Sequence, residues 1–180
     1  QNLRVKELLS EAMGAELLLT ESYHTTIQKK DFIYFAKRGK TLCESGMSSK
    51  CAYQLGLFVS RRPYQNEEMF QKDNFVFWRD SLTKKYIIGP EKEQVTYMEC
   101  ENTLPIKTKR LSIDGHYCVE YRGWWNMVNA TMGGPFITWL LVDEKNSQLY
   151  LIDGFVFAPN FSKKKFLNEL EGMAKTFKVL

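Results

Sequence analysis

The sequence predicts a mixed α+β domain, in which helices pack on an antiparallel sheet. Three observations support this fold class. Helical spacing of apolar residues occurs near the start, in the middle and at the end of the chain. Strand-like segments follow one another in the second half. Two pairs of these segments are joined by turn sequences that are typical of β-hairpins.

The helices are predicted from apolar periodicity and from their end signals. Apolar residues recur at helical spacing over 3–13, and Gly14 suits the end of that helix. A long central helix is expected over 66–86, with Asn66 as its N-cap and Gly89-Pro90 ending it. Its expected apolar stripe consists of Met69, Phe70, Phe77, Leu82 and Tyr86. A last amphipathic helix is expected over 162–178, with Ser162 as its N-cap.

Strands are expected where aromatic and β-branched residues gather, over 16–20, 32–36, 52–60 and 96–101. The clearest hairpin joins 107–113 to 116–123 through Asp114-Gly115, which is typical of a type I′ turn. This turn places Ile113 opposite His116, Leu111 opposite Cys118 and Lys109 opposite Glu120. A second hairpin is expected from 136–142 and 149–157, and the nearly continuous apolar run of the latter predicts a central strand.

The composition is that of one ordered domain spanning residues 1–180. The net charge is +4 and the basic residues are scattered, so we expect no nucleic-acid partner. No apolar run approaches the roughly 18 residues that a transmembrane helix needs. The glycine-rich segment Met132-Gly133-Gly134-Pro135 lacks the lysine of a phosphate loop, and no cofactor is expected. We interpret that segment as a tight turn leading into a strand; the alternative is a loop at the rim of a binding groove.

The chain has four cysteines, at positions 43, 51, 100 and 118. None belongs to a C-x-x-C pair or has a histidine at metal-ligand spacing, so no metal site is expected. We expect four free, mostly buried thiols. A Cys43–Cys51 bridge is the alternative, provided that the flanking strands pair closely.

Candidate ligand-binding residues come from an aromatic-rich stretch that also contains an arginine: Tyr121, Arg122, Trp124 and Trp125. Alternation along a strand would direct Trp124 and Trp125 to opposite faces. Asp153 joins the candidates because it is the one charge in the run 149–157. We expect Arg122 to hold Asp153, with Glu120 as a competitor and a bulge at Gly154 as the alternative. The segments 117–136 and 153–159 should then lie side by side.

Three sequence blocks carry a family resemblance. They are Arg79-Asp80-Ser81 with the later Gly89-Pro90; Gly115 to Trp125 followed by Met132 to Phe136; and Asp153 to Pro159. Together they resemble the Bacteroidetes envelope lipoproteins called domain of unknown function 4837. The segment between Cys43 and Cys51 departs from that pattern by its length and its Ser and Gly content. A weaker, fold-level likeness is to the PsbP-like fold.

The resemblance implies that the chain is the C-terminal part of a longer, exported lipoprotein, which touches the membrane only through a lipid anchor ahead of this segment. It implies no activity and no catalytic residues. We therefore expect a non-catalytic envelope module that binds a protein or a glycan. The alternative is a hydrolase that uses His116 or the Glu120–Asp153 region, although neither His24 nor His116 lies in a nucleophile motif.

Overall fold

The computed structural model describes residues 3–43, 50–89 and 94–180. Its helices and strands, in chain order, are α1 (Leu3–Met13), β1 (Ala15–Glu16), β2 (His24–Lys29), β3 (Phe32–Leu42), β4 (Lys50–Pro63), the 3-10 turn η1 (Glu67–Phe70), α2 (Lys72–Tyr86), β5 (Met98–Cys100), β6 (Lys107–Ile113), β7 (His116–Met127), β8 (Gly133–Asp143), β9 (Gln148–Phe157), α3 (Lys164–Ala174) and β10 (Lys178–Val179). The fold is α+β with antiparallel sheets, which confirms the predicted class.

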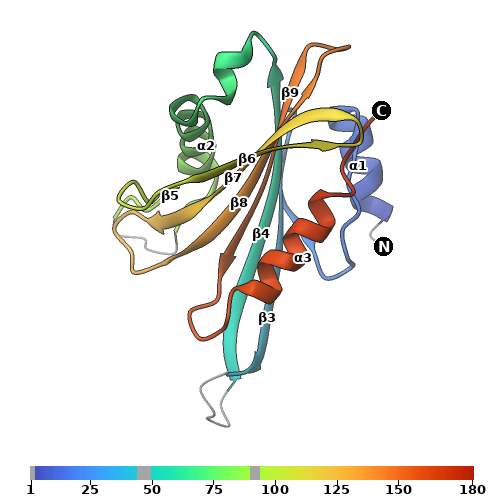
Figure 1. Ribbon diagram of the computed structural model, residues 1–180. Coiled ribbons are helices and arrows are strands. Elements are labelled where there is room, and N and C mark those ends of the chain that lie inside the picture. The colour runs from blue at the N-terminus through green and yellow to red at the C-terminus, as the bar shows by residue number, and fades with distance from the viewer. Residues whose placement is uncertain (1–2, 44–49, 90–93) are drawn as a thin grey trace.

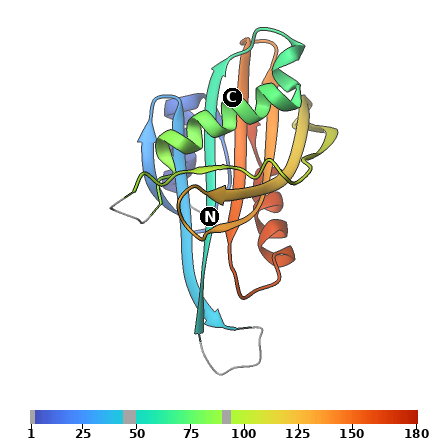
Figure 2. The same cartoon turned by 90° about the vertical axis from the view of Figure 1, so that its left-hand side faces the viewer.

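One large antiparallel sheet lies between two layers of helix. Its strand order is β2-β3-β4-β9-β8-β7-β5, and β6 pairs with the first half of β7. Helix α2 covers one face, while α1 and α3 cover the other (Figures 1 and 2). Each face has its own apolar cluster, one including Phe75 of α2 and the other Leu9 of α1 and Leu170 of α3. None of the described helices has both the length and the apolar character that crossing a bilayer requires.

The two predicted hairpins are present. In the first, Asp114 and Gly115 adopt φ angles of 50° and 82°, as a type I′ turn needs, and all three predicted residue pairs across it are observed. In the second, β9 lies between β4 and β8 and its interior is buried on both faces, as expected of a central strand. Two strands were not predicted: the exposed edge strand β2 and the short β10, which pairs with a β1 that is shorter than expected.

The predicted 66–86 helix was wrong in one respect, because the chain breaks at Gln71. Asn66 does act as an N-cap, but its side chain accepts the Glu68 N–H of η1 and not of a long helix. Gln71 is extended, with φ −66° and ψ 144°, and α2 begins after it. Of the predicted stripe, Met69, Phe70, Leu82 and Tyr86 do pack in the apolar cluster on this face, whereas Phe77 is exposed.

The segment Met132-Gly133-Gly134-Pro135 is not the predicted turn, because Gly133 already begins β8. Gly134 is required by close packing. A Cβ atom at this position would lie 1.9 Å from the Val156 carbonyl oxygen of β9. The glycine thus lets neighbouring backbones approach each other at this end of the sheet.

The C-terminal helix is shorter than the predicted 162–178. α3 begins at Lys164 with Lys163 at its N-cap position, so the expected N-cap role of Ser162 was wrong. Its Leu170 packs against β9 at Gly154, where a Cβ atom would come within 3.1 Å of a Leu170 methyl carbon. Gly154 stays in regular register with both neighbouring strands, so the alternative of a bulge there is not observed.

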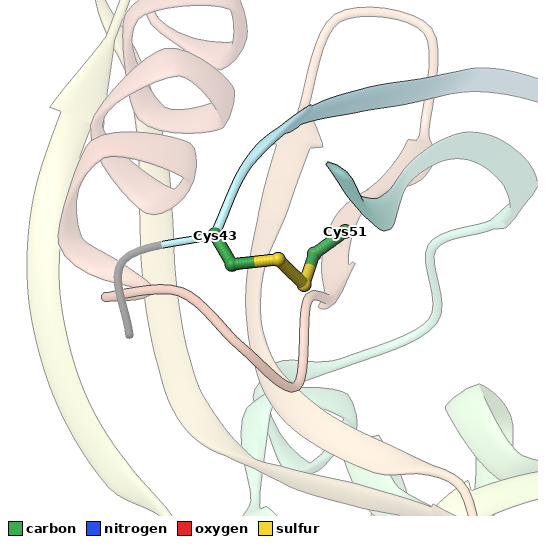
Figure 3. The surroundings of a disulfide bond; sticks show 2 residues. All are labelled: Cys43 and Cys51. Carbon is green, nitrogen blue, oxygen red and sulfur yellow. A yellow bond between two sulfur atoms is a disulfide. The ribbon is translucent and has the colours of Figure 1, made fainter. Parts of the chain in front are cut away.

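A disulfide joins Cys43 and Cys51, which corrects the expectation of four free thiols. The two Cα atoms lie 5.2 Å apart, where β3 and β4 pair residue by residue up to Leu42 and Lys50 (Figure 3). This close pairing was the condition for the bridge, and a bridge between adjacent strands fits normal disulfide geometry. Cys100 and Cys118 are free and buried, as predicted. The loop 44–49, where the sequence departs from the family pattern, lies outside the described residues.

Counting thiols by mass tests this pairing. In denaturant without reductant, iodoacetamide should modify two cysteines, Cys100 and Cys118, because Cys43 and Cys51 are joined. Prior reduction should raise the count to all four. As a control, Cys118→Ser should lower each count by one. Four modified cysteines in the unreduced, freshly purified protein would contradict the bridge.

Candidate functional site

Helix α2 faces the sheet through residues spaced three and four apart. Phe75, Trp78, Arg79 and Thr83 are buried, and Leu82 and Tyr86 are partly buried beside them. Phe75 stacks on Tyr121 of β7 with ring centroids 3.9 Å apart. The stripe therefore includes an arginine and a threonine, whereas the apolar Phe77 points away from the sheet and is 76% exposed.

Arg79 forms a buried ion pair with Asp153 of the central strand β9. Arg79 Nε lies 2.8 Å from Asp153 Oδ2, and Nη2 lies 3.4 Å from Oδ1. Both side chains are 0% exposed. Thr138 of β8 also donates its hydroxyl hydrogen to Asp153, so the carboxylate has partners from a helix and from the neighbouring strand. A bidentate pair of this kind fixes the position of the arginine as well as its charge.

The surroundings of the guanidinium suit a permanent charge. It lies over the Phe136 ring at 4.0 Å, and its Nη1 lies 3.6 Å from Cys100 Sγ. Burial alone would lower the pKa of Arg79, but the interactions with Asp153, Cys100 and Asp80 together outweigh it and the pKa is raised. Burial raises the pKa of the Cys100 thiol to about 12, so this cysteine is neutral. A neutral, buried thiol is not a ready nucleophile.

Helix α2 also covers the outer edge of the short strand β5. The Asp80 carboxylate accepts the Cys100 N–H at 2.9 Å, and the Ile87 carbonyl accepts the Met98 N–H at 3.0 Å. The Thr83 hydroxyl donates to the Met98 carbonyl at 2.7 Å. Polar atoms that an edge strand would otherwise expose are therefore paired with the helix.

A groove of about 860 Å³ lies along the outer side of α2, opposite its buried stripe. It is bounded by α2, by Tyr97 and Glu99, and by the segment 101–106. Its apolar part includes Phe77 and Leu104, the latter 44% exposed. Glu99 reaches this groove because Met98 and Cys100, on either side of it in β5, point inward to Arg79.

Acids outnumber bases along the groove. Four carboxylates, those of Asp73, Asp80, Glu99 and Glu101, line it against two lysines. Lys84 Nζ lies 4.6 Å from the centroid of the Tyr97 ring, so its positive charge already interacts with an aromatic ring of the groove. Hydrogen bonds from Thr103 lower the pKa of Glu101, which keeps this carboxylate ionised at neutral pH. The groove thus combines an exposed apolar surface with an excess of negative charge.

The structure divides the predicted site residues between the two faces of the sheet. Tyr121, Trp125 and Asp153 lie on the α2 side. Trp124 and Arg122 lie on the α3 side, where they line a small hollow of about 260 Å³ with Leu167 of α3. The prediction that adjacent tryptophans face opposite ways is confirmed, since Trp124 is 46% exposed and Trp125 is 2% exposed. None of the five predicted residues lines the large groove.

The predicted Arg122–Asp153 pair was wrong. Asp153 is held by Arg79 on the α2 face, whereas Arg122 Nε lies 2.6 Å from Glu120 Oε1 and its Nη2 lies 3.0 Å from Glu171 Oε2 of α3. The pattern did place Glu120 and Arg122 on one face, but β8 separates β7 from β9 in the sheet. Consequently the segments 117–136 and 153–159 do not pair along their length. They meet where Phe136 pairs with Phe155 and where the Trp125 ring lies 5.7 Å from the Phe155 ring.

The residues of the alternative hydrolase do not converge. Glu120 and Asp153 point to opposite faces of the sheet, and so do not form an acid pair. His116 Nδ1 lies 3.1 Å from the Val142 carbonyl oxygen, and His24 lies on the exposed strand β2 at the other end of the sheet. Within residues 3–43, 50–89 and 94–180, no three His, Cys, Asp or Glu side chains are grouped as a metal site would require.

Removing one member of the buried pair should be costly. Asp153→Leu or Arg79→Met leaves an unpaired charge in the core, and each should lower the free energy of unfolding by about 3–5 kcal/mol in urea titrations. The double variant should recover part of that loss. Lys6→Met, which breaks the partly exposed Lys6–Glu16 pair, is the control and should cost less than about 1 kcal/mol. Equal costs for the buried and the partly exposed pair would contradict this assignment.

Stability should fall at alkaline pH. Burial raises the pKa values of the Cys100 and Cys118 thiols, so the folded protein keeps protons that the unfolded chain releases above the ordinary thiol value of 9.0. The stabilisation is complete below that value and is lost as the pH rises toward the folded-state values. Each thiol contributes a slope of about 1.4 kcal/mol per pH unit. Cys118→Ala should reduce the slope measured by urea unfolding between about pH 8 and about pH 10.5; an unchanged slope would contradict this origin.

Comparison with known proteins places the chain in a family whose function is not assigned. A comparison with curated proteins found no match. The model of the family described as domain of unknown function 4837 matches residues 2–176, which is nearly the whole chain and includes α2, β5 and the buried Arg79–Asp153 pair. The chain therefore belongs to the domain of unknown function 4837 family.

Proposed function

We propose that this chain is a non-catalytic binding module of a lipid-anchored cell-envelope protein, and that the groove along α2 binds a short apolar and basic segment of a partner protein. The observation that carries the proposal is the groove itself, which has a volume of about 860 Å³ and exposes Phe77. Exposed apolar surface rimmed by polar groups is typical of interaction sites.

The charges that line the groove indicate the charge that a partner segment should carry. Four carboxylates against two lysines favour a ligand with positive charge close to its apolar side chains. The edge of β5 is already covered by α2, so the partner would not extend the sheet there. Recognition would instead rest on apolar side chains that pack against Phe77 and Leu104 while basic side chains meet Glu99 and Glu101.

The disulfide supports the proposed compartment. Bridges such as Cys43–Cys51 form and persist in oxidising environments, including the bacterial periplasm. This agrees with the export that the family resemblance implies. The separation of Glu120 from Asp153 by the sheet speaks for binding over hydrolysis.

The peptide site can be tested with a defined probe. A fluorescein-labelled peptide of alternating leucine and lysine should bind saturably in anisotropy titrations, and its counterpart of leucine and glutamate should not. Phe77→Ala should weaken binding at least about tenfold, because the central apolar contact is lost. This substitution should leave the fold intact, since the Phe77 side chain is largely exposed.

Trp124→Ala is the matched control. It removes an exposed aromatic ring from the α3 face of the sheet, where Trp124 and Arg122 were predicted to bind a ligand. This substitution should leave peptide affinity unchanged. Equal binding of both peptides, or equal losses in the two variants, would overturn the groove as the site. Binding of envelope glycans that is lost in Trp124→Ala, without peptide binding, would assign the function to the α3 face.

A further inference from the structure

A second, smaller pocket lies beneath the C-terminal end of α2, on the inner side of β5. Its volume is about 330 Å³, which is enough for a small ligand. The walls are mostly apolar, with aromatic rings from β7 and β9 and three methionines, Met98, Met127 and Met132. Unbranched methionine side chains adapt readily to a bound apolar group. Met132, from the glycine-rich segment, is one of these lining residues.

Two hydrogen-bond donors of this pocket have no acceptor among the described residues. Trp125 is 2% exposed, and its Nε1 is buried without a hydrogen-bond partner. Tyr34, which is also buried, accepts a hydrogen bond from Gln54 Nε2 at 3.1 Å, and its own hydroxyl hydrogen meets no acceptor within the part of the chain that the structure describes. Burial raises the pKa of Tyr34, so the hydroxyl remains a donor at neutral pH. A buried donor left unpaired costs roughly 1–3 kcal/mol, and an oxygen of a ligand would remove that cost.

The charge of the pocket is positive. Among the described residues that line it, Arg38 is the one charged side chain, and no carboxylate faces it. Arg38 lies opposite Gln54 in the β3–β4 pairing, and its Nε donates to Gln54 Oε1 at 3.2 Å. Gln54 therefore connects the exposed guanidinium to the buried Tyr34 hydroxyl. An anionic group at the mouth would meet Arg38, while the remainder of the ligand would lie against Trp125 and Phe155.

We infer that this pocket binds a small apolar carboxylic acid, whose carboxylate pairs with Arg38 and the Tyr34 hydroxyl toward the mouth and whose alkyl or aryl body packs among the methionines and against Trp125 and Phe155. This site differs from the peptide groove in position and in sign of charge. Met98 faces the pocket and its neighbour Glu99 faces the groove, so the two sites lie on opposite sides of β5. Neither site depends on the other for its ligand.

The indole N–H signal of Trp125 gives a direct readout. The chain has four tryptophans, and Trp125→Phe should remove one indole signal from a ¹⁵N–¹H spectrum and so assign it. Sodium decanoate should shift the Trp125 signal saturably and leave the exposed Trp124 signal in place. Decan-1-ol should bind about tenfold more weakly, and decylamine more weakly still, because neither pairs with Arg38.

Three variants make the test decisive. Arg38→Ala, at an exposed position that should not affect folding, should weaken decanoate binding about tenfold while leaving decan-1-ol binding unchanged. Arg110→Ala, an exposed arginine on β6, and Phe77→Ala, in the groove, should both leave decanoate affinity unchanged. No shift of the Trp125 signal, equal affinity for decylamine, or loss of decanoate binding in Phe77→Ala would each overturn the assignment.

Discussion

The ion pair between Arg79 and Asp153 sets the position of α2, and the groove and the pocket on either side of β5 follow from that position. The two groups meet at 2.8 Å with no exposed surface. A buried charge cannot exchange its partner for water without a large cost, so the helix cannot slide or rotate on the sheet as an all-apolar contact would allow. Such a pair contributes specificity more than net stability, since apolar replacements of buried pairs are often neutral.

The short strand β5 separates two different concave surfaces beside this helix. Helix α2 holds β5 through Asp80, Thr83 and Ile87. Met98 then faces the enclosed, positively charged pocket, and Glu99 faces the open, acidic groove. One helix and three strand residues thus separate a site suited to an apolar anion from a site suited to an apolar and basic peptide.

The sequence predicted the sheet better than the helix that defines the sites. The Asp114-Gly115 turn determined the β6–β7 register, and the apolar run of β9 revealed a central strand. The stripe of α2 was predicted only in part: Leu82 and Tyr86 do face the sheet, but two of its core residues, Arg79 and Thr83, are polar, while the apolar Phe77 faces outward. Arg122 was chosen for Asp153 because it is nearby in an expected strand pairing. The partner that the structure shows comes from a helix 74 residues away in sequence, and no local pattern carries that information. Trp125 was among the predicted binding residues, but its pocket requires six strands and the end of α2 to come together.

Hydrogen exchange tests the central role of the ion pair most directly. In Asp153→Asn, the amides of α2 between Phe75 and Tyr86 should lose protection through local opening, while those of α3 on the opposite face should exchange at the rates of the unchanged protein. That pattern would show that the buried pair holds α2 in place. Unchanged protection of α2, or an equal loss of protection in both helices, would contradict the claim that Arg79 and Asp153 fix the helix and the two sites beside it.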